Sequence, residues 1–377
     1  MNERNKIKVC YLVSSLCNEG PVNVMYNIIK YIDFSIFDIS IITFIPEKSN
    51  SRIDEFRKFP IEIYQLSPDK LLSLISLYKR LKQQVKIIDP DELHAHCPRS
   101  LYLMPFLSKK YKKIYTIHIY PGEQQVKLYG AIKGRIVIAL NHFFTKRCDL
   151  PIACAESVAW QYKKHKNWDV VAVPNGCSLP IWKYDESEKE RLRNEFGMKK
   201  ELKYFIFIGR FSKEKNPDIL FHAFKNVKRK DIGLVMLGTG PMWDSLKRDC
   251  PDNILMPGFT TRVYDYMKAS DFYISVSDVE GLANTILESM SVGLPMLLSD
   301  IPSHKEVLDN VDKNKTVGYI VDKFSSKDIY EKINLLYKLD REQVCHTVQK
   351  LYKRKYTAEI MSRSYQKEYL NIMQKEL

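Results

Sequence analysis

No hydrophobic run in the sequence is long enough to cross a membrane. A spanning helix needs about 18 consecutive apolar residues or more, and the apolar runs of this 377-residue chain are much shorter. The charged segment Met1–Lys8 leads into Val9–Val13, which is too short for the apolar region of a signal peptide and has no small-residue cleavage site. We therefore expect a cytoplasmic protein in which Val9–Val13 forms the first β-strand.

The sequence also lacks a cysteine framework. Its eight cysteines are scattered, and none forms a Cys-x-x-Cys pair. Several lie in apolar, strand-like segments, so we expect reduced core cysteines in place of disulfides or a zinc site.

Motifs for other nucleotide chemistry are missing or interrupted. Gly238 and Gly240 follow a predicted strand, but Trp243 stands where a dinucleotide-binding loop needs its third glycine, so a dehydrogenase is not expected. The segment Asp89–Asp91 has the spacing of a metal–nucleotide motif. Its central residue is proline and it precedes a strand, which predicts a turn.

Two histidines provide the one pattern that resembles a metal site. His94 and His96 alternate onto one face of the predicted strand Glu92–His96, so both could bind one metal ion. They lack an evident further ligand. We therefore expect no metal ion and no other cofactor.

Positive charge is concentrated in the first half of the chain. Residues 1–180 contain 26 Lys and Arg against 16 Asp and Glu, in a chain whose net charge is +14. Three basic clusters contribute, at Lys79–Lys86, Lys109–Lys113 and Lys163–Lys166, the last framed by Trp160 and Trp168. Cations mixed with aromatic residues suit an anionic membrane surface. A solvated surface remains the simpler explanation for any single cluster, and no recognised nucleic-acid motif supports a nucleic-acid partner.

Short apolar runs alternate with helical patterns along the whole chain, which is typical of parallel sheets covered by helices on both faces. In the first half, the predicted strands are Val9–Val13, Ile39–Phe44, Ile61–Gln65, Glu92–His96, Lys113–His118, Leu150–Cys154 and Val170–Val173, and the predicted helices are 21–32, 69–87, 98–109, 129–145 and 156–164. In the second half, the predicted strands are Lys203–Ile208, Gly233–Leu237, Asn253–Met256, Phe272–Ser275, Met296–Ser299 and Gly318–Val321.

The pattern predicts two Rossmann-like, doubly wound domains that face a cleft. The turn signal Pro174–Cys177 places the junction near its end. We expect the first domain to comprise residues 1–178 and the second residues 179–355. The amphipathic segment 356–377 is long enough to return to the first domain and complete it.

A pair of glutamates, Glu280 and Glu288, lies at one predicted strand-to-helix loop. Glu280 follows the strand Phe272–Ser275, and Glu288 lies one to two turns into the next helix. A helix start presents free N–H groups and the positive end of its dipole, which suits a phosphate. Two carboxylates on either side of a phosphate fit the hydroxyls of a nucleotide sugar. On the pair alone, an ordinary strand-to-helix connection is the better explanation of these residues.

Two cations follow an earlier strand of the same domain. Arg210 and Lys215 come after Lys203–Ile208, and Gly209 allows a tight turn there. A planar guanidinium and a point-like ammonium at this spacing can converge on one diphosphate. Both loops should lie at the carboxyl edge of one sheet, where ligands of such folds bind.

Together, Gly209-Arg210-x4-Lys215 and the Glu280/Glu288 pair resemble the donor site of glycosyltransferase family 4, whose members are retaining enzymes with the GT-B fold. The resemblance covers most of the chain and is strongest from about 170 to 310. It includes Pro174–Gly176, Leu237–Pro241, Pro257–Phe259 and the terminal helix with its Tyr365 and Tyr369.

The resemblance implies roles for the residues of the second domain. Arg210 and Lys215 would neutralise the diphosphate, Glu280 would contact the transferred sugar, and Glu288 would accept hydrogen bonds from the ribose. Phe259 would lie near the base. The phosphate would be cradled at the helix start by Gly281, Leu282, Ala283 and Thr285.

The first domain is expected to contribute fewer residues. His118, at the end of its strand, matches a histidine that is common near the reacting centre of the family. Gly20 matches one of two adjacent glycines in a phosphate-binding loop, but Glu19 replaces the other. A carboxylate beside a phosphate would repel it, so Glu19 points away or this loop serves the acceptor.

We therefore expect a metal-independent retaining hexosyltransferase related to bacterial O-antigen and capsule enzymes. It would move a hexose or N-acetylhexosamine from a nucleoside diphosphate, expected to be UDP, to a polyprenyl-diphosphate-linked oligosaccharide at the inner face of the cell membrane. Two alternatives stay open: a GT-B sugar-nucleotide epimerase or hydrolase, and a non-catalytic membrane-associated partner protein.

Overall fold

A computed structural model describes residues 6–227, 229–311 and 315–374 of the chain. The chain divides into two compact units. The N-terminal unit comprises Met1–Ser178 and Thr357–Leu377, and the C-terminal unit comprises Leu179–Tyr356. The expected junctions lie within one residue of these positions.

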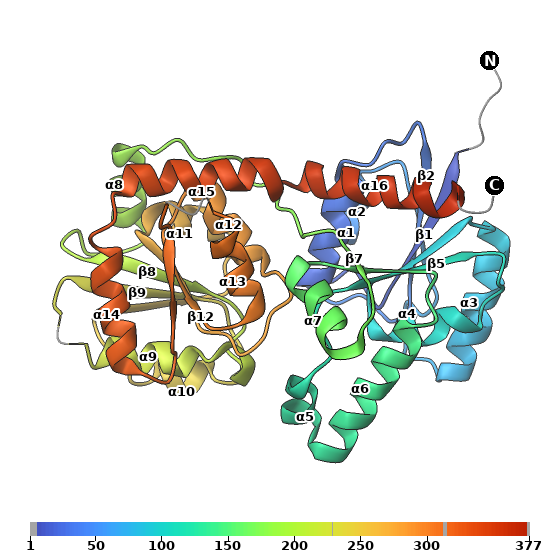
Figure 1. The fold of residues 1–377 in the computed structure, drawn as a ribbon, viewed down its shortest axis with the longest axis horizontal. Helices are drawn as coiled ribbons and strands as arrows, with labels where there is room; N and C mark the ends of the chain where they lie inside the picture. Colours follow the sequence, from blue (N-terminus) through green and yellow to red (C-terminus); the bar gives the residue numbers. More distant parts are fainter. Residues whose placement is uncertain (1–5, 228, 312–314, 375–377) are drawn as a thin grey trace. The chain divides into compact units, whose positions relative to one another are not determined.

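The N-terminal unit is built on a parallel sheet of seven strands in the order β3-β2-β1-β4-β5-β6-β7 (Figure 1). The strands are β1 Ile7–Val13, β2 Phe37–Thr43, β3 Glu62–Gln65, β4 Glu92–Ala95, β5 Lys112–Ile117, β6 Leu150–Ala153 and β7 Val171–Ala172. The helical segments are α1 Gly20–Lys30, α2 Ile53–Phe56, α3 Leu74–Ile88, α4 Pro98–Leu103, η1 Met104–Phe106, α5 Glu123–Tyr129, α6 Ala131–Thr145, α7 Glu156–Lys166 and α16 Ala358–Gln374.

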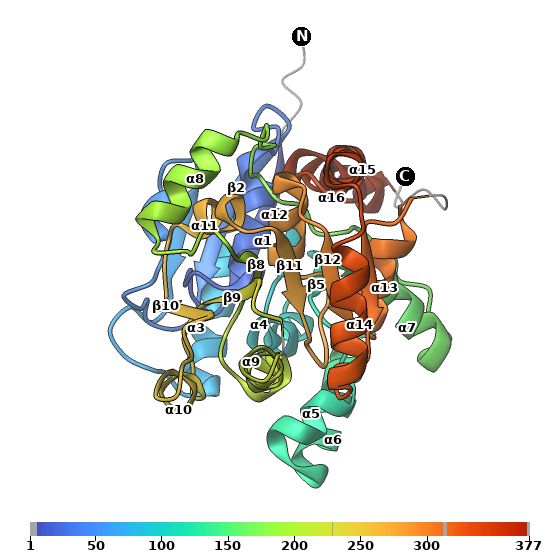
Figure 2. The same ribbon diagram turned by 90° about the vertical axis from the view of Figure 1, so that its left-hand side faces the viewer.

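The C-terminal unit has a parallel sheet of six strands in the order β10-β9-β8-β11-β12-β13 (Figure 2). The strands are β8 Lys203–Ile208, β9 Ile232–Leu237, β10 Ile254–Gly258, β11 Phe272–Ser275, β12 Met296–Ser299 and β13 Gly318–Val321. The helical segments are α8 Glu186–Glu195, η2 Lys213–Lys215, α9 Pro217–Lys225, α10 Trp243–Lys247, α11 Val263–Ala269, α12 Asn284–Val292, α13 Pro302–Asp309, α14 Ser326–Leu336 and α15 Arg341–Lys355.

The central strands are mostly apolar because helices cover both faces of each sheet. In β8, Phe205 and Phe207 are buried together with Ile274 of β11 and Leu220 of α9. Burial of such side chains stabilises the fold by about 1.5–3 kcal/mol each. The continuous apolar runs of the sequence follow from this arrangement.

Helix α16 belongs to the core of the N-terminal unit although it lies at the other end of the chain. Tyr365 and Tyr369 are fully buried with residues of β1 and α1. The Tyr369 hydroxyl lies 2.8 Å from the hydroxyl of Tyr11 and 2.8 Å from Nδ1 of His94. The buried hydroxyls are therefore hydrogen-bonded, as burial requires.

One helix of the N-terminal unit was not predicted. The expected helix 129–145 corresponds to α6, but the separate helix α5 precedes it, and the two helices meet at Gly130 with φ +81°. An added Cβ at Gly134 would lie 2.5 Å from Cα of Val126, so the backbones of the two helices touch. Only glycines at both positions permit this tight hairpin, and the 3.6-residue pattern does not reveal it.

Candidate active site

The predicted donor residues lie at the topological switch point of the C-terminal sheet. From β8 the chain proceeds to β9 and β10 on one side, whereas β11 starts the series on the other side. β8 and β11 are parallel neighbours, with Phe205 opposite Phe272. The loops after these two strands therefore emerge side by side at the carboxyl edge, where such folds bind ligands.

Asn216 links the two loops. It has a left-handed backbone with φ +50°, which asparagine tolerates better than most residues. Its amide Nδ2 donates to the carbonyl of Val276 at 3.0 Å and to Oδ1 of Asp278 at 2.9 Å. The backbone N–H of Asp278 donates to the carbonyl of Glu214 at 2.8 Å. Asn216 was not among the predicted site residues, because its contacts depend on the adjacency of β8 and β11.

Lys215 and Glu280 form an ion pair across this link. The Lys215 ammonium contacts Oε1 of Glu280, which also accepts a hydrogen bond from the Ser277 hydroxyl at 2.8 Å. The two side chains are 26% and 13% exposed. Burial opposes ionisation of Glu280, but the Lys215 charge outweighs it and lowers the pKa of the carboxyl. The structure thus brings a predicted diphosphate ligand and a predicted sugar ligand into direct contact.

The other predicted ligands of this loop surround the start of α12. Ala283 is the N-cap of the helix, and Gly281 and Leu282 precede it. The Thr285 hydroxyl lies 2.8 Å from the hydroxyl of Tyr273 in β11. Thr285 is therefore fixed on the sheet before any ligand arrives.

Glu288 lies in the second turn of α12. Burial raises the pKa of its carboxyl to about 7. A partner that donates hydrogen bonds, such as a diol, would stabilise the ionised form of this buried carboxyl.

Arg210 and Phe259 mark the side of the switch point that faces β9 and β10. Arg210 is exposed, and its guanidinium has no ion pair within the part of the chain that the structure describes. Phe259 follows β10 and is 66% exposed. Gly238 allows the loop after β9 to approach the loop after β8 closely, since an added Cβ would lie 2.0 Å from the Gly209 carbonyl oxygen. One charged and one aromatic side chain are thus available to a ligand here.

Two residues at this edge were missed by the sequence interpretation. Lys323 follows β13, and its ammonium is paired with Oδ1 of Asp278. His304 of α13 is fully buried, its Nδ1 lies 3.0 Å from the Ser299 carbonyl, and its Nε2 has no partner among the described residues. Burial lowers the pKa of His304 to about 4, against the opposing influence of Glu280. Only the strand order brings these side chains toward the glutamate loop.

The N-terminal unit has its own switch point between β1 and β4. Gly20 is the first residue of α1, and Glu19, its N-cap, is exposed and makes no side-chain capping bond. The backbone N–H of Leu16 in the preceding loop donates to the carboxylate of Glu47. Part of the loop after β1 is therefore already occupied by a carboxylate of the protein.

His118 follows β5 and is held by a second histidine. Its Nε2 lies 3.2 Å from Nδ1 of His96, which is buried. Burial lowers the pKa of His118 to about 4, so the ring is neutral at pH 7. His94 is engaged through both nitrogens, with Tyr369 and with Thr116. Neither His94 nor His96 is part of a group of ligands that could hold a metal among the described residues.

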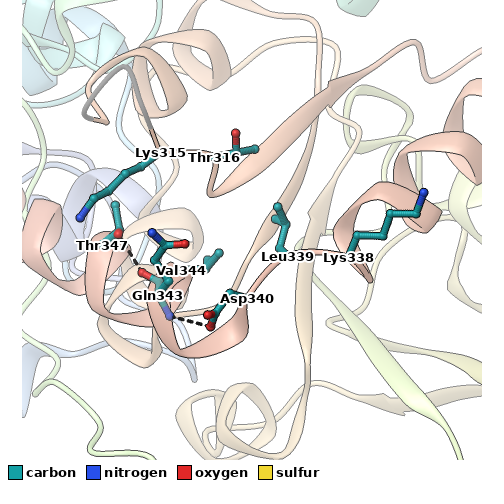
Figure 3. Close-up of a pocket in the computed structure, with 8 residues that line it drawn as sticks. All are labelled: Lys315, Thr316, Lys338, Leu339, Asp340, Gln343, Val344 and Thr347. Carbon is teal, nitrogen blue, oxygen red and sulfur yellow. Dashed lines mark hydrogen bonds between the residues drawn. The ribbon is translucent and has the colours of Figure 1, made fainter.

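A pocket of the C-terminal unit lies away from these loops. Figure 3 shows it between the segment that enters β13 and the start of α15, lined among others by Thr316, Asp340 and Thr347. It lies at the amino edge of the sheet, opposite the glutamate loop. A second pocket, at the carboxyl ends of β12 and β13, includes Lys323 and exposed Phe324 and adjoins the candidate site.

Both halves of the chain match family models. Residues 188–354 match the glycosyl transferases group 1 model, and residues 19–179 match the model of glycosyltransferase family 4. Two parallel-sheet units with these sites define the GT-B class. The chain belongs to glycosyltransferase family 4.

Comparisons with individual proteins support the fold. Anabaena Alr3699/HepE, solved in complex with UDP-glucose, has a TM-score of 0.78 at 16% identity, over 97% of this chain and 100% of that one. Alpha-monoglucosyldiacylglycerol synthase of Streptococcus pneumoniae is 26% identical over 60% of this chain and 54% of its own length. The Escherichia coli UDP-Gal:alpha-D-GlcNAc-diphosphoundecaprenol alpha-1,3-galactosyltransferase is 25% identical over 48% of each chain. The matched region spans about half the length of these two curated relatives.

Proposed function

We propose that the protein is a retaining glycosyltransferase that uses a nucleoside-diphosphate sugar, with UDP as the nucleotide. The observation that carries this proposal is the Lys215–Glu280 ion pair at the switch point of the C-terminal sheet. Before the donor binds, the two charges satisfy each other. An arriving diphosphate would draw the ammonium of Lys215, and the Glu280 carboxylate would then accept hydrogen bonds from the sugar hydroxyls.

The remaining donor contacts follow from the order of the loops. Arg210 has a free guanidinium for the second phosphate, and the start of α12 offers its N–H groups. Glu288 would accept hydrogen bonds from the ribose, and exposed Phe259 would pack against the base. Cationic side chains would stabilise the leaving diphosphate without a divalent cation.

The transfer step needs no protein nucleophile in this proposal. The acceptor oxygen would form its bond to the anomeric carbon on the face from which the diphosphate departs, as the bond from that carbon to the diphosphate oxygen breaks. The acceptor proton would pass to the departing diphosphate oxygen. Neutral His118 would act as a hydrogen-bonding group near the reacting centre.

We propose a lipid-linked sugar as the acceptor, namely a polyprenyl-diphosphate-linked oligosaccharide of surface polysaccharide synthesis. The names of two relatives support this choice, since one contains a diacylglycerol glucoside and the other a diphosphoundecaprenol acceptor. The described residues contain no helix long and apolar enough to cross a membrane. We propose peripheral association with the cytoplasmic face of the membrane.

Nucleotide release separates the proposal from its rivals. The purified protein is incubated with UDP-sugars, with and without a polyprenyl-diphosphate-linked acceptor, in buffer with magnesium or with EDTA. We expect UDP release only with the acceptor, α-linked product from an α-linked donor, and equal rates with EDTA. UDP release that ignores the acceptor would indicate a hydrolase, and interconversion of UDP-sugars would indicate an epimerase. No turnover and no UDP binding would indicate a non-catalytic partner.

A further inference from the structure

The hairpin of α5 and α6 carries the densest group of exposed apolar side chains on the N-terminal unit. Figures 1 and 2 show it extending beyond the helices that flank the sheet of this unit. Its exposed large apolar residues, which we call the hairpin face, are Leu128, Tyr129, Ile132, Ile136, Leu140 and Phe143. Ile132 is 78% exposed and Leu128 64%. Such a contiguous apolar group on a protein surface usually marks an interaction site.

Helix α6 exposes a stripe of large apolar residues. Ile132, Ile136, Leu140 and Phe143 recur every three or four residues and form one exposed stripe. Gly134, Asn141, His142 and Thr145 lie on the other side and are buried. The inner side alone accounts for the packing of the helix. The outer stripe therefore has no function in the fold of the unit.

The charge of the hairpin has one sign. Between Glu123 and Asp149 the chain contains no acidic residue, whereas it contains Lys127, Lys133, Arg135, Lys146 and Arg147. Lys133 and Arg135 flank the apolar stripe and are exposed. Arg147 lies over the Phe143 ring, 3.4 Å from its centroid. An apolar stripe bordered by long cationic side chains has the composition of helices that lie in an anionic lipid interface.

Cations in two of the three basic clusters identified from the sequence are already engaged within the protein. The Lys110 ammonium is paired with Asp89, and Lys163 is paired with Asp169 at 2.8 Å. Lys113 is buried and donates to the carbonyl of Ser108 at 3.0 Å. These cations have partners within the protein, and the hairpin combines charge with exposed apolar area.

We propose that the hairpin face docks the N-terminal unit on an anionic phospholipid bilayer, with its apolar stripe in the interface and its cations at the headgroups. The backbones of α5 and α6 are in contact at Gly134, so the two helices of the hairpin are packed against each other before any lipid is bound. A second copy of the chain is a poor occupant, because two like-charged surfaces would repel each other. The inference deepens the proposed function, since a lipid-borne acceptor lies in the same membrane, but vesicle binding itself requires no turnover.

Vesicle sedimentation with the full chain tests the proposal. Vesicles contain phosphatidylcholine alone or with about one third phosphatidylglycerol, which supplies the negative surface potential. The variant Ile132→Ser/Ile136→Ser removes the stripe, and Lys133→Gln/Arg135→Gln removes two cations. Matched controls elsewhere are Phe324→Ser, an equally exposed apolar residue, and Lys199→Gln/Lys200→Gln.

We expect wild type and both controls to bind the anionic vesicles and to bind the neutral ones weakly. The stripe variant should bind at least about tenfold less than wild type, because two exposed isoleucines lose their burial in lipid. The charge variant should lose its preference for anionic vesicles. Circular dichroism equal to wild type shows that all variants are folded, and UDP binding equal to wild type shows the same for the two hairpin variants.

Three results would overturn the docking proposal. The first is a wild-type protein that does not bind anionic vesicles. The second is a stripe variant that binds these vesicles as well as wild type does. A wild-type dimer that dissociates on Ile132→Ser/Ile136→Ser would assign the face to a second copy. Vesicle binding without any sugar transfer would leave docking intact and refute the proposed function alone.

Discussion

The two switch points of the molecule have the same topology and different chemistry. In the C-terminal unit, the loops after β8 and β11 bring together the charges of Lys215, Glu280 and Asp278. In the N-terminal unit, the loop after β1 holds the Glu47 carboxylate, and His96, which follows β4, contacts neutral His118. The ammonium of the first site suits a diphosphate, and the carboxylate and imidazoles of the second suit the hydroxyls of an acceptor. The topology therefore provides two similar crevices, and local side chains decide what each one binds.

Loss of Lys215 should have the largest effect. Lys215→Ala removes the cation expected on the leaving diphosphate and leaves the Glu280 carboxylate without its partner. We expect kcat to fall by about 10²–10³, as for other preorganised charge-stabilising groups. The matched control is Lys213→Ala, an exposed lysine of the same short helical turn. Equal rates for the two variants would contradict the role of Lys215, and a UDP-release assay measures both.

Substitution of His118 should separate the two crevices. His118→Ala should lower the transfer rate by about 10²-fold, as expected for the loss of one hydrogen-bonding group at the reacting centre, and leave UDP affinity unchanged. Calorimetry of UDP binding and turnover with acceptor give the two values. A large loss of UDP affinity would place His118 in the donor site instead.

Substitution of Glu288 should increase the stability of the unliganded protein and weaken UDP binding. Because burial raises its folded pKa to about 7, well above the ordinary value, the ionised carboxylate costs stability that increases as pH rises toward 7. Glu288→Gln should therefore stabilise the unliganded protein at pH 8, by up to about 3 kcal/mol, with little change at pH 5. It should weaken UDP binding about tenfold if one charged hydrogen bond to the ribose is lost.

The pH dependence of UDP binding gives a second measure of Glu288. In wild type, affinity should fall as pH drops through about 7, because the protonated carboxyl accepts hydrogen bonds from the ribose less well. In Glu288→Gln the slope should disappear. Titration calorimetry at pH 6 and pH 8 decides this, and an unchanged slope in the variant would refute the assignment.

The smallest effect concerns the N-terminal sheet away from its carboxyl edge. Glu92 of β4 is fully buried, and its two oxygens have no hydrogen-bond partner among the described residues. Burial, with help from Asp91, raises the pKa of Glu92 to about 9. Since this pKa is raised, stability is lost as pH rises toward 9. Glu92→Leu should stabilise the protein by about 1–3 kcal/mol at pH 7, and thermal unfolding at pH 5 should show a smaller gain.

The parallel sheets and their order along the chain were predictable from local pattern. The predicted strands Lys203–Ile208, Phe272–Ser275, Met296–Ser299 and Gly318–Val321 are confirmed at both ends, because buried parallel strands are apolar throughout. Convergence of Arg210, Lys215 and Glu280 at one edge followed from the same periodicity. The GT-B fold and the family are also confirmed.

Side-chain pairings and the second face of α6 were not predictable in this way. The Asn216 link and the Lys323–Asp278 pair require the spatial order of strands, which the sequence does not state. The break at Gly130 depends on the contact of Gly134 with Val126, a tertiary feature. For α6, a stripe of large apolar residues is exposed while Gly134, Asn141, His142 and Thr145 are buried, so only the packed structure shows which side faces the unit.

The place of α16 in the N-terminal core has a consequence for synthesis on the ribosome. The first 178 residues emerge early, but their core lacks Tyr365 and Tyr369 until the end of the chain is translated. The C-terminal unit is complete once Tyr356 has left the exit tunnel. The unit that is translated second can therefore finish folding first, and the N-terminal unit must wait with part of its apolar surface uncovered.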